Sequence, residues 1–202
     1  MFYETHAPHG LPHNPFKALV APRPIGWIST LSQDGVANLA PYSYFNAIGN
    51  APPMVMFAPN GRVGGRLKDT LTNVSETGEF VVNIVSEALK DAMNETARHV
   101  PADSDEFALA GLTPEPSRLV KPPCVAESPA HLECRHHQTI ELPADDAEVP
   151  QFIVLGQVVG VHIDDAVLRD GMVDMAKLRP LARLGYFDYS VVDNFFSMPT
   201  PD

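Results

Sequence analysis

The sequence reads Ile25-Gly26-Trp27-Ile28-Ser29-Thr30-Leu31-Ser32, then Gln33-Asp34-Gly35, then Val36-Ala37-Asn38-Leu39-Ala40-Pro41-Tyr42-Ser43-Tyr44-Phe45, and this stretch decides the fold. The first and third segments are rich in apolar, aromatic and β-branched residues, which favour strands. An Asp-Gly pair between two such segments is a strong hairpin signal, because glycine adopts the positive φ that tight hairpin turns require. We therefore expect an antiparallel hairpin over residues 25–45.

Further strand-like segments follow, without regular alternation of strands and helices. Met54–Ala58 is apolar throughout, which predicts a central strand, because a strand buried on both faces needs apolar residues at every position. Two long segments joined by the acidic loop Pro143-Ala144-Asp145-Asp146 predict an antiparallel pair. The strands expected after the hairpin are Met54–Ala58, Glu79–Val85, His131–Leu142, Phe152–Ile163 and a last piece near Arg183–Val192.

Two short helices are predicted between these strands. Leu67, Leu71 and Val74 recur at helical spacing, and Gly78 stands where a helix would end. The second helix would be capped by Ser86 and would carry Leu89, Met93 and Ala97.

The length of the chain and its many prolines and glycines indicate one mainly β domain over residues 1–202. Twenty prolines and 13 glycines cut the chain into short segments. Residues 1–24 carry no clear period and are expected to run as an extended arm across the body. Residues 99–129 are expected to form a proline-rich loop with one helical piece near Phe107. We predict an antiparallel β-barrel with α decoration rather than a doubly wound nucleotide fold.

Charge and composition disfavour several classes of partner. A net charge of −11 argues against duplex nucleic acid and anionic membranes, which attract cationic proteins. No apolar run approaches the roughly 20 residues that span a bilayer, and the first residues lack the pattern of a secretory signal. Cys124 and Cys134 lie outside any CxxC pattern, so neither a disulfide scaffold nor a cysteine zinc site is expected. We expect a cytoplasmic protein whose two thiols are free and buried.

A basic, glycine-rich stretch, Gly61-Arg62-Val63-Gly64-Gly65-Arg66-Leu67-Lys68-Asp69-Thr70, leads into the first predicted helix. Phosphate binding needs close backbone N–H groups, a helix start and cationic or hydroxyl donors, and this stretch contains all of them. Arg62, Arg66 and Lys68 are three of only fourteen basic residues in the chain. The stretch is neither a Walker A motif nor a dinucleotide fingerprint, so a solvated loop before a capped helix is the open alternative.

The segment Asn38–Phe45 is dense in aromatic and polar groups around Pro41. Proline within a strand indicates a bulge or an unpaired edge. A flat ring with a polar rim, such as a flavin, needs aromatic or aliphatic walls together with N–H and hydroxyl groups at the rim. The segment suits such a wall, and the residues leave core packing of its aromatic side chains open as the alternative.

Seven blocks, in order along most of the chain, resemble the flavin reductase-like family. The first four are Pro22-Arg23-Pro24-Ile25-Gly26-Trp27-Ile28-Ser29-Thr30, Asn38-Leu39-Ala40-Pro41-Tyr42-Ser43-Tyr44-Phe45, Lys68-Asp69-Thr70 and Glu79-Phe80-Val81-Val82-Asn83-Ile84. The later three are Ser128-Pro129-Ala130-His131-Leu132-Glu133-Cys134, Gly156-Gln157-Val158-Val159-Gly160-Val161-His162-Ile163 and Leu181-Ala182-Arg183-Leu184-Gly185.

This resemblance implies a split β-barrel that forms a homodimer, with FMN held noncovalently near the subunit interface. The residues that it places on the flavin ring or its ribityl chain are Trp27, Ser29, Thr30, Asn38, Leu39, Ala40, Pro41, Tyr42 and Ser43. Those that it places on the phosphate are Lys68, Asp69 and Thr70, and less specifically Arg23 and Arg66.

His162 is the one candidate for a catalytic side chain. On a strand it would share a face with Val158 and Gly160, and the resemblance places that face near the flavin. There it would orient the nicotinamide or supply a proton, while a satisfied structural histidine is the open alternative. The histidines and Cys134 within residues 131–137 lie on opposite faces of a strand, so no metal site is expected.

The resemblance implies that NAD(P)H reduces bound FMN, and that reduced flavin or electrons then pass to a partner such as an oxygenase. FMN is expected rather than FAD, because the sequence shows one phosphate site. A non-enzymatic FMN electron carrier of the flavoredoxin type would carry nearly the same motifs and is the leading alternative. An amine oxidase of the pyridoxamine phosphate oxidase type fits the seven blocks poorly.

Overall fold

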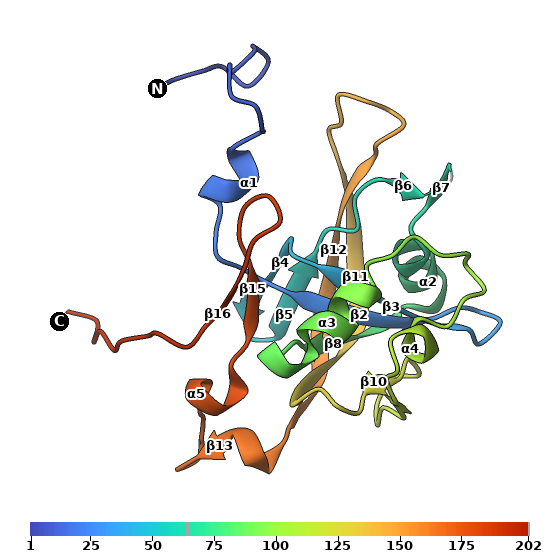
Figure 1. The fold of residues 1–202 in the computed structure, drawn as a ribbon. Coiled ribbons are helices and arrows are strands. Elements are labelled where there is room, and N and C mark those ends of the chain that lie inside the picture. Colours follow the sequence, from blue (N-terminus) through green and yellow to red (C-terminus); the bar gives the residue numbers. More distant parts are fainter. Residues whose placement is uncertain (64, 202) are drawn as a thin grey trace.

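A computed structural model describes residues 1–63 and 65–201, and its main feature is one seven-stranded sheet (Figure 1). All of its neighbouring strands are antiparallel, as the sequence predicts. In spatial order they are β3 (Ala37–Tyr42), β2 (Gly26–Leu31), β8 (Glu79–Ile84), β11 (Ala130–Leu142), β12 (Gln151–Ile163), β5 (Pro53–Phe57) and β4 (Phe45–Asn50).

The sheet curls into an open barrel because its two edge strands are neighbours in the chain. Only Ser43 and Tyr44 separate β3 from β4, so the two edges must come together, yet β3 and β4 are not paired. The ring of Phe45, the first residue of β4, packs against Gly26 of β2, where a Cβ atom would lie 2.6 Å from the ring. A glycine is therefore required at this contact.

The predicted hairpin is confirmed as β2 and β3, joined by a turn in which Gly35 has a φ of 84°. The prediction of one strand over Val36–Phe45 is wrong, because β3 ends at Tyr42 and Phe45 begins β4. The chain must leave the first edge of the sheet and join the other at this point. Pro41 lies on the edge strand, where a missing N–H group breaks no ladder bond.

The other long strands match their predictions. β5 lies between β12 and β4, and β8 lies between β2 and β11. β11 and β12 form the expected long pair, but their register shifts between Glu133 and Cys134 and between His136 and Gln138. These β-bulges change which side chains share a face.

The first predicted helix is confirmed as α2 (Asp69–Thr77), which ends at Gly78 with a left-handed φ of 74°. The second consists of the 3-10 turn η1 (Glu87–Leu89) and α3 (Lys90–Glu95), and the side chain of Ser86 makes no capping hydrogen bond. The helical piece expected near Phe107 is α4 (Glu106–Leu109), which is capped by Asp105.

Short elements complete the fold, and the last predicted strand proves to be a hairpin of two strands. The short strands are β1 (Arg23–Pro24), β6 (Arg62–Val63), β7 (Arg66–Leu67), β9 (Pro114–Glu115), β10 (Cys124–Val125), β13 (Leu168–Arg169), β14 (Met172–Val173), β15 (Leu181–Arg183) and β16 (Tyr189–Val191). The short helices are α1 (Phe16–Leu19), η2 (Asp165–Val167) and α5 (Met175–Leu178).

The N-terminal segment projects from the barrel rather than crossing it, which corrects the expectation for residues 1–24 (Figure 1). Phe2 and Leu11 are exposed, so this stretch buries little apolar surface that would hold it on the body. Arg23 anchors its base, because the guanidinium donates hydrogen bonds to the carbonyls of Lys17, Val20 and Leu184.

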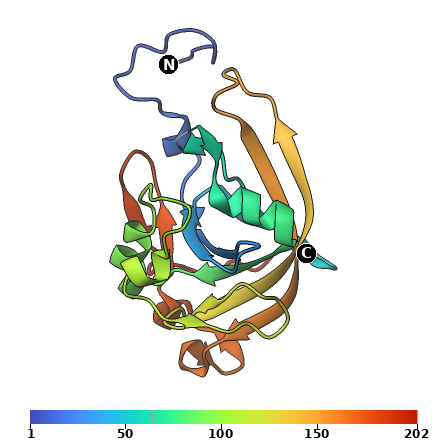
Figure 2. The ribbon, with the colours of Figure 1, turned by 90° about the vertical axis from the view of Figure 1, so that its right-hand side faces the viewer.

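The core lies on both faces of the central strands. Trp27 packs with Phe107 and other residues beneath α3 and α4, whereas its neighbour Ile28 packs on the opposite face. That second cluster includes Phe80 and two residues of α2, which covers it (Figure 2). Both cysteines are buried and free, as predicted. Among residues 1–63 and 65–201, no helix is long and apolar enough to cross a membrane.

Candidate functional site

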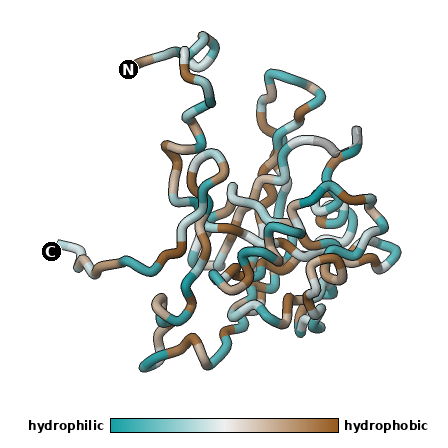
Figure 3. Tube along the Cα trace, in the orientation of Figure 1, coloured by the Kyte–Doolittle hydropathy of each residue, from teal (hydrophilic) through white to brown (hydrophobic). Residues whose placement is uncertain are grey.

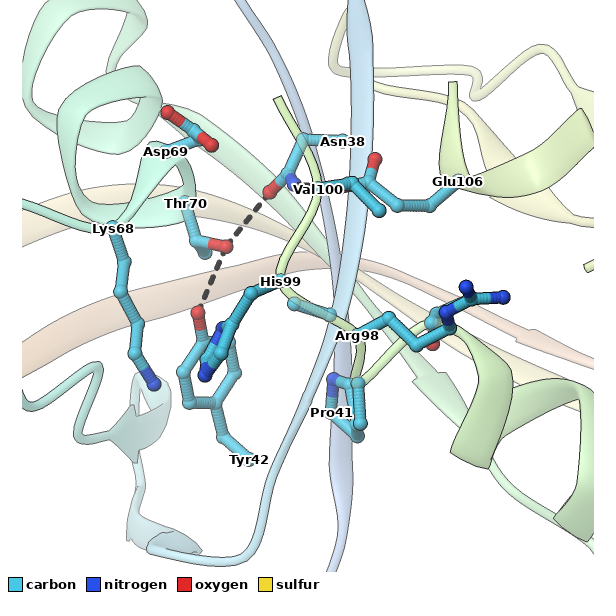
Figure 4. A pocket seen from close by; sticks show the side chains of 13 residues that line it. Asn38, Pro41, Tyr42, Lys68, Asp69, Thr70, Arg98, His99, Val100 and Glu106 are labelled. Atoms are coloured by element: carbon cyan, nitrogen blue, oxygen red, sulfur yellow. Dashed lines mark hydrogen bonds between the residues drawn. The ribbon is translucent and has the colours of Figure 1, made fainter. Parts of the chain in front are cut away.

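A pocket opens beside the edge strand β3, at the start of α2 and under the segment that follows α3 (Figure 4). β3 and α2 supply one wall, while the far wall comes from residues 96–100 and from α4. The residues that line it are Asn38, Ala40, Pro41, Tyr42, Lys68, Asp69, Thr70, Thr96, Ala97, Arg98, His99, Val100 and Glu106.

A chain of hydrogen bonds forms the floor of this pocket. The Tyr42 hydroxyl donates to Thr70 Oγ1 at 2.9 Å, and Thr70 Oγ1 donates to Asn38 Oδ1 at 2.7 Å. Asn38 Nδ2 donates to Glu106 Oε1 at 2.9 Å. Thr30 lies beneath the floor and also bonds to Asn38 Oδ1, at 3.3 Å. The floor is therefore polar, ordered and buried.

Lys68 is the cationic side chain of the pocket on the side of α2, and Arg98 is the one on the far wall. Lys68 precedes the first residue of α2 with extended backbone, and its side chain runs from there towards Tyr42 (Figure 4). Its Nζ atom lies 5.2 Å from the centre of the Tyr42 ring. Burial and the neighbouring Lys17 lower the pKa of Lys68, because both disfavour the charged form. An anion bound beside Lys68 would oppose both effects, because a nearby negative charge stabilises the charged form of lysine.

Two acidic side chains of the floor, the Tyr42 phenol and the Glu106 carboxyl group, have shifted pKa values. Burial raises the pKa of Tyr42 far above its ordinary value, so its hydroxyl stays protonated and can donate. Burial also raises the pKa of Glu106, although hydrogen bonds from the Leu39 N–H and the Asn38 amide oppose the shift. The Glu106 carboxylate is thus held in a place that disfavours its charge.

The structure brings together half of the residues that the sequence assigns to the cofactor. Seven line the pocket: Asn38, Ala40, Pro41, Tyr42, Lys68, Asp69 and Thr70. The other seven do not border it: Arg23, Trp27, Ser29, Thr30, Leu39, Ser43 and Arg66. The assigned contacts of all fourteen with FMN remain predictions.

Most of the seven residues that do not border the pocket make defined contacts elsewhere in the fold. Trp27 is fully buried and donates from Nε1 to Thr96 Oγ1 at 2.8 Å. Ser29 donates to the Pro123 carbonyl. Every nitrogen of the Arg23 guanidinium donates within the chain, to three carbonyls and to Ser43 Oγ. Arg66 is exposed on β7, close in sequence to Gly64, which lies outside the described residues.

The far wall of the pocket is missed by the sequence analysis. His99 and Glu106 belong to the stretch 99–129, which was interpreted as a proline-rich loop, and Arg98 directly precedes it; no period singles out any of the three. A usable signal is Asp105-Glu106, where Asp105 caps a short helix and a second carboxylate follows at once. In Figure 4, His99 and Lys68 point to the same part of the pocket, beside Tyr42.

His162 lies at a different cavity, with Arg118, Cys124 and His131. Its Nε2 atom is 3.1 Å from Oε1 of Glu133, a fully buried carboxylate that also accepts hydrogen bonds from the N–H groups of Arg118 and Leu119. Burial alone would raise the pKa of Glu133, but these three hydrogen bonds lower it. The catalytic role of His162 remains a prediction.

The expectation that Val158 shares a face with His162 is wrong. Glu133 pairs with Gly160 and Cys134 pairs with Val158, so Val159 is the extra residue of a bulge. Val158 packs with the cluster of Phe80, whereas Val159 packs on the other face of the sheet. A strict period of two cannot place side chains across a bulge.

Comparisons with known proteins cover the whole region of the pocket. Residues 19–188 match the family described as the flavin reductase like domain. An uncharacterised protein of Aquifex aeolicus (strain VF5) is 41% identical over 168 residues, which are 83% of each chain. Nitrilotriacetate monooxygenase component B from Bacillus cereus is 30% identical, with a TM-score of 0.89 over 98% of both chains. A protein with a split barrel domain from Shewanella frigidimarina NCIMB 400 is 25% identical, with a TM-score of 0.79 over 92% of this chain and 90% of that one.

Proposed function

The chain belongs to the flavin reductase-like family, and on that premise we propose that it is an NAD(P)H-dependent reductase that holds FMN noncovalently in the pocket beside β3. The observation that carries the proposal is the half-buried Lys68 at the start of α2, next to a polar floor and a flat apolar wall. A cation, a helix N-terminus and an aromatic wall are the elements that a ring with one phosphate requires.

The phosphate end of the proposed site is built from Lys68 and the first turn of α2. The first N–H groups of a helix have no partner within it, so those of Asp69 and Thr70 suit an anion. The Thr70 hydroxyl already donates to Asn38, so Thr70 would contribute its backbone rather than its side chain. Lys17 adds a second positive charge close by.

The part of the proposed site that would hold the flavin ring is built from Ala40, Pro41 and Tyr42. Asn38 would be the polar group at the edge of that ring. An amide nitrogen carries two hydrogens, and Asn38 uses one of them on Glu106, so a second donor is left for a ligand. This donor set fits FMN. When bound, FMN supplies the acceptor for the hydride of the nicotinamide. The protein residues hold the ring in place, orient its polar edge and exclude water on the side of β3.

Partners and location form part of the same proposal. The Bacillus cereus relative is described as a component of a monooxygenase, which supports an oxygenase as the acceptor of reduced flavin or electrons. A homodimer is supported by exposed apolar side chains such as Val161 and Met172, and by Phe195 and Phe196 in the C-terminal tail outside the barrel (Figure 3). Two free buried thiols suit the reducing cytoplasm.

The proposal is tested by flavin binding and by flavin reduction. We expect the purified protein to bind FMN, and the flavin absorption to bleach when NADH or NADPH is added without oxygen. Flavin that stays oxidised with both nucleotides but responds to dithionite would instead indicate an electron carrier. Failure to bind FMN supplied in excess would reject the proposed function.

Lys68 is tested by comparing FMN with riboflavin, which lacks the phosphate. Lys68→Ala should weaken FMN binding roughly tenfold or more, because charge-assisted contacts to phosphate are strong. Riboflavin affinity should change by much less. Lys121→Ala is the matched control, since Lys121 is exposed and does not border the pocket. An equal loss for both flavins would contradict the placement of the phosphate.

A further inference from the structure

β3 is an edge strand, and one carboxylate engages its outward side at the pocket. Ser32 N–H donates to the Val36 carbonyl, so the hydrogen-bonded pairs of the hairpin include Thr30 with Asn38 and Gly26 with Tyr42. By this alternation the N–H group of Leu39 points away from β2, and it donates to Glu106 Oε2 at 3.3 Å. The next outward position is Pro41, which has no N–H group.

Glu106 also determines the orientation of the Asn38 amide. An ionised carboxylate only accepts hydrogen bonds, so Asn38 must turn its nitrogen towards Glu106 and its oxygen towards Thr70 and Thr30. Both hydroxyl groups must then donate to Asn38. Thr70 is left to accept from Tyr42, and Thr30 accepts from Asn73 Nδ2 at 3.0 Å. One group that only accepts thus fixes the direction of the whole network.

We propose that Glu106 is a positioning residue for the flavin. It joins α4 to the edge strand and sets which side-chain atoms of Asn38, Thr70 and Tyr42 are left to donate to a ligand and which can only accept. This inference rests on the proposed function, because it concerns the same pocket. It also gives residues 99–129 a role, since α4 lies in this stretch and brings the carboxylate to a strand 67 positions away in the chain.

The informative substitution is Glu106→Gln, which keeps the shape of the side chain. The glutamine nitrogen would face either the Leu39 N–H or the Asn38 amide, and a donor cannot bond to a donor. The network can recover only if Asn38 turns over and the hydroxyl groups of Thr70 and Tyr42 reverse. The chain can then still fold, but the pocket presents a different pattern of donors.

We expect Glu106→Gln to weaken riboflavin and FMN binding by about tenfold, the effect of mismatching one buried hydrogen bond. Loss for both flavins separates this effect from that of Lys68→Ala, which is specific for the phosphate. Glu127→Gln is the matched control, because Glu127 lies in the same stretch and accepts from the Thr113 N–H, but is exposed and does not border the pocket.

A double substitution tests the direction of the hydrogen bonds. In Asn38→Asp with Glu106→Gln, the amide and the carboxylate exchange places, and the total charge is unchanged. The glutamine introduced by Glu106→Gln would donate to the new carboxylate on β3, whose oxygens accept from Thr70 and Thr30, so the original directions return. We expect the double variant to recover the resistance to urea denaturation that Glu106→Gln loses. Riboflavin binding should stay weak, because Asn38→Asp removes the amide hydrogen proposed to face the ring.

Each outcome bears on the inference. Wild-type affinity in Glu106→Gln, with the apo proteins equally folded, would overturn it. So would a double variant that is no more stable to urea than Glu106→Gln, because the direction of the hydrogen bonds would then not be what Glu106 sets. If the wild-type protein binds neither flavin, the proposed function fails first, and the inference that rests on it fails with it.

Discussion

Glu106 and Glu133 are both carboxylates that accept backbone N–H groups beneath a cavity, but the two environments shift their pKa values in opposite directions. Glu106 accepts from one backbone N–H and one neutral amide, and burial raises its pKa. Glu133 accepts from two backbone N–H groups and from His162, and these bonds lower its pKa despite complete burial. The charged neighbours differ as well, because Asp69 raises the pKa of Glu106 whereas His162 lowers the pKa of Glu133.

On the proposal made for Glu106, the difference separates a group that holds the fold together from one that serves a binding site. Glu133 ties the loop at Arg118 and Leu119 to β11, and its charge is well compensated. Glu106 is less well compensated and lines the proposed flavin pocket. Residues that serve binding are often held in surroundings that are not optimal for stability.

The largest expected effect follows from Glu133→Gln. The glutamine nitrogen would face the Arg118 N–H, the Leu119 N–H or His162, and a buried donor would lose its acceptor. We expect the free energy of unfolding to fall by about 2–3 kcal/mol, measured by urea denaturation. The exposed Glu127→Gln should change it by less than about 0.5 kcal/mol. A similar small change for Glu133→Gln would contradict the comparison.

The pH dependence of stability should distinguish the two carboxylates. Ionised Glu133 stabilises the fold above its unfolded pKa of about 4.3, and this stabilisation is lost as the pH falls through its lower folded pKa. Ionised Glu106 has the opposite sign, so its cost at neutral pH is relieved as the pH falls through its raised folded pKa.

The measurement is the free energy of unfolding of the wild type minus that of each glutamine variant, from pH 7 to pH 3. Subtraction cancels the other charged groups of the pocket, which are Asp69, Lys68, Arg98 and His99. The advantage of the wild type over Glu133→Gln should shrink below about pH 4. Its difference from Glu106→Gln should move in its favour between neutral pH and about pH 4. If the two differences in the free energy of unfolding change with pH in parallel, the opposite pKa shifts of Glu106 and Glu133 are refuted.

The smallest effect is expected at His162, whose side chain is only partly buried and is one of three donors to Glu133. His162→Ala should lower the free energy of unfolding by about 1 kcal/mol. FMN affinity should stay within about twofold of wild type, because His162 does not border the pocket of Lys68. A tenfold loss of FMN affinity would show that the two cavities belong to one site, as the resemblance to the family suggests.

Local patterns predicted the elements whose causes are local. The Asp34-Gly35 turn and the end of α2 at Gly78 were predictable, because glycines with positive φ are required at both places. The end of β3 at Tyr42 was not, since it depends on where the curled sheet brings its second edge. The order of strands in the barrel was not predicted, because it depends on pairing between segments that lie far apart in the chain.

Only the side of the candidate site that is built from the seven blocks of the family resemblance was predicted. Asn38, Tyr42 and Lys68 stand in recognisable blocks, but Glu106 meets Asn38 across 68 positions of chain. Such a contact depends on how the irregular segment after α3 folds over β3. For His162 the prediction of its face relied on strict alternation, and the bulge at Val159 breaks that alternation.

The unpaired seam between β3 and β4 has a consequence for solubility. An exposed edge is a template on which a strand from another molecule can add, and edge-to-edge addition begins many aggregates. On β3, an incoming strand would find the outward donor of Leu39 already engaged by Glu106 and no donor at all at Pro41. The barrel can therefore stay open along this line, at the proposed mouth of its pocket, without inviting a second chain to continue the sheet.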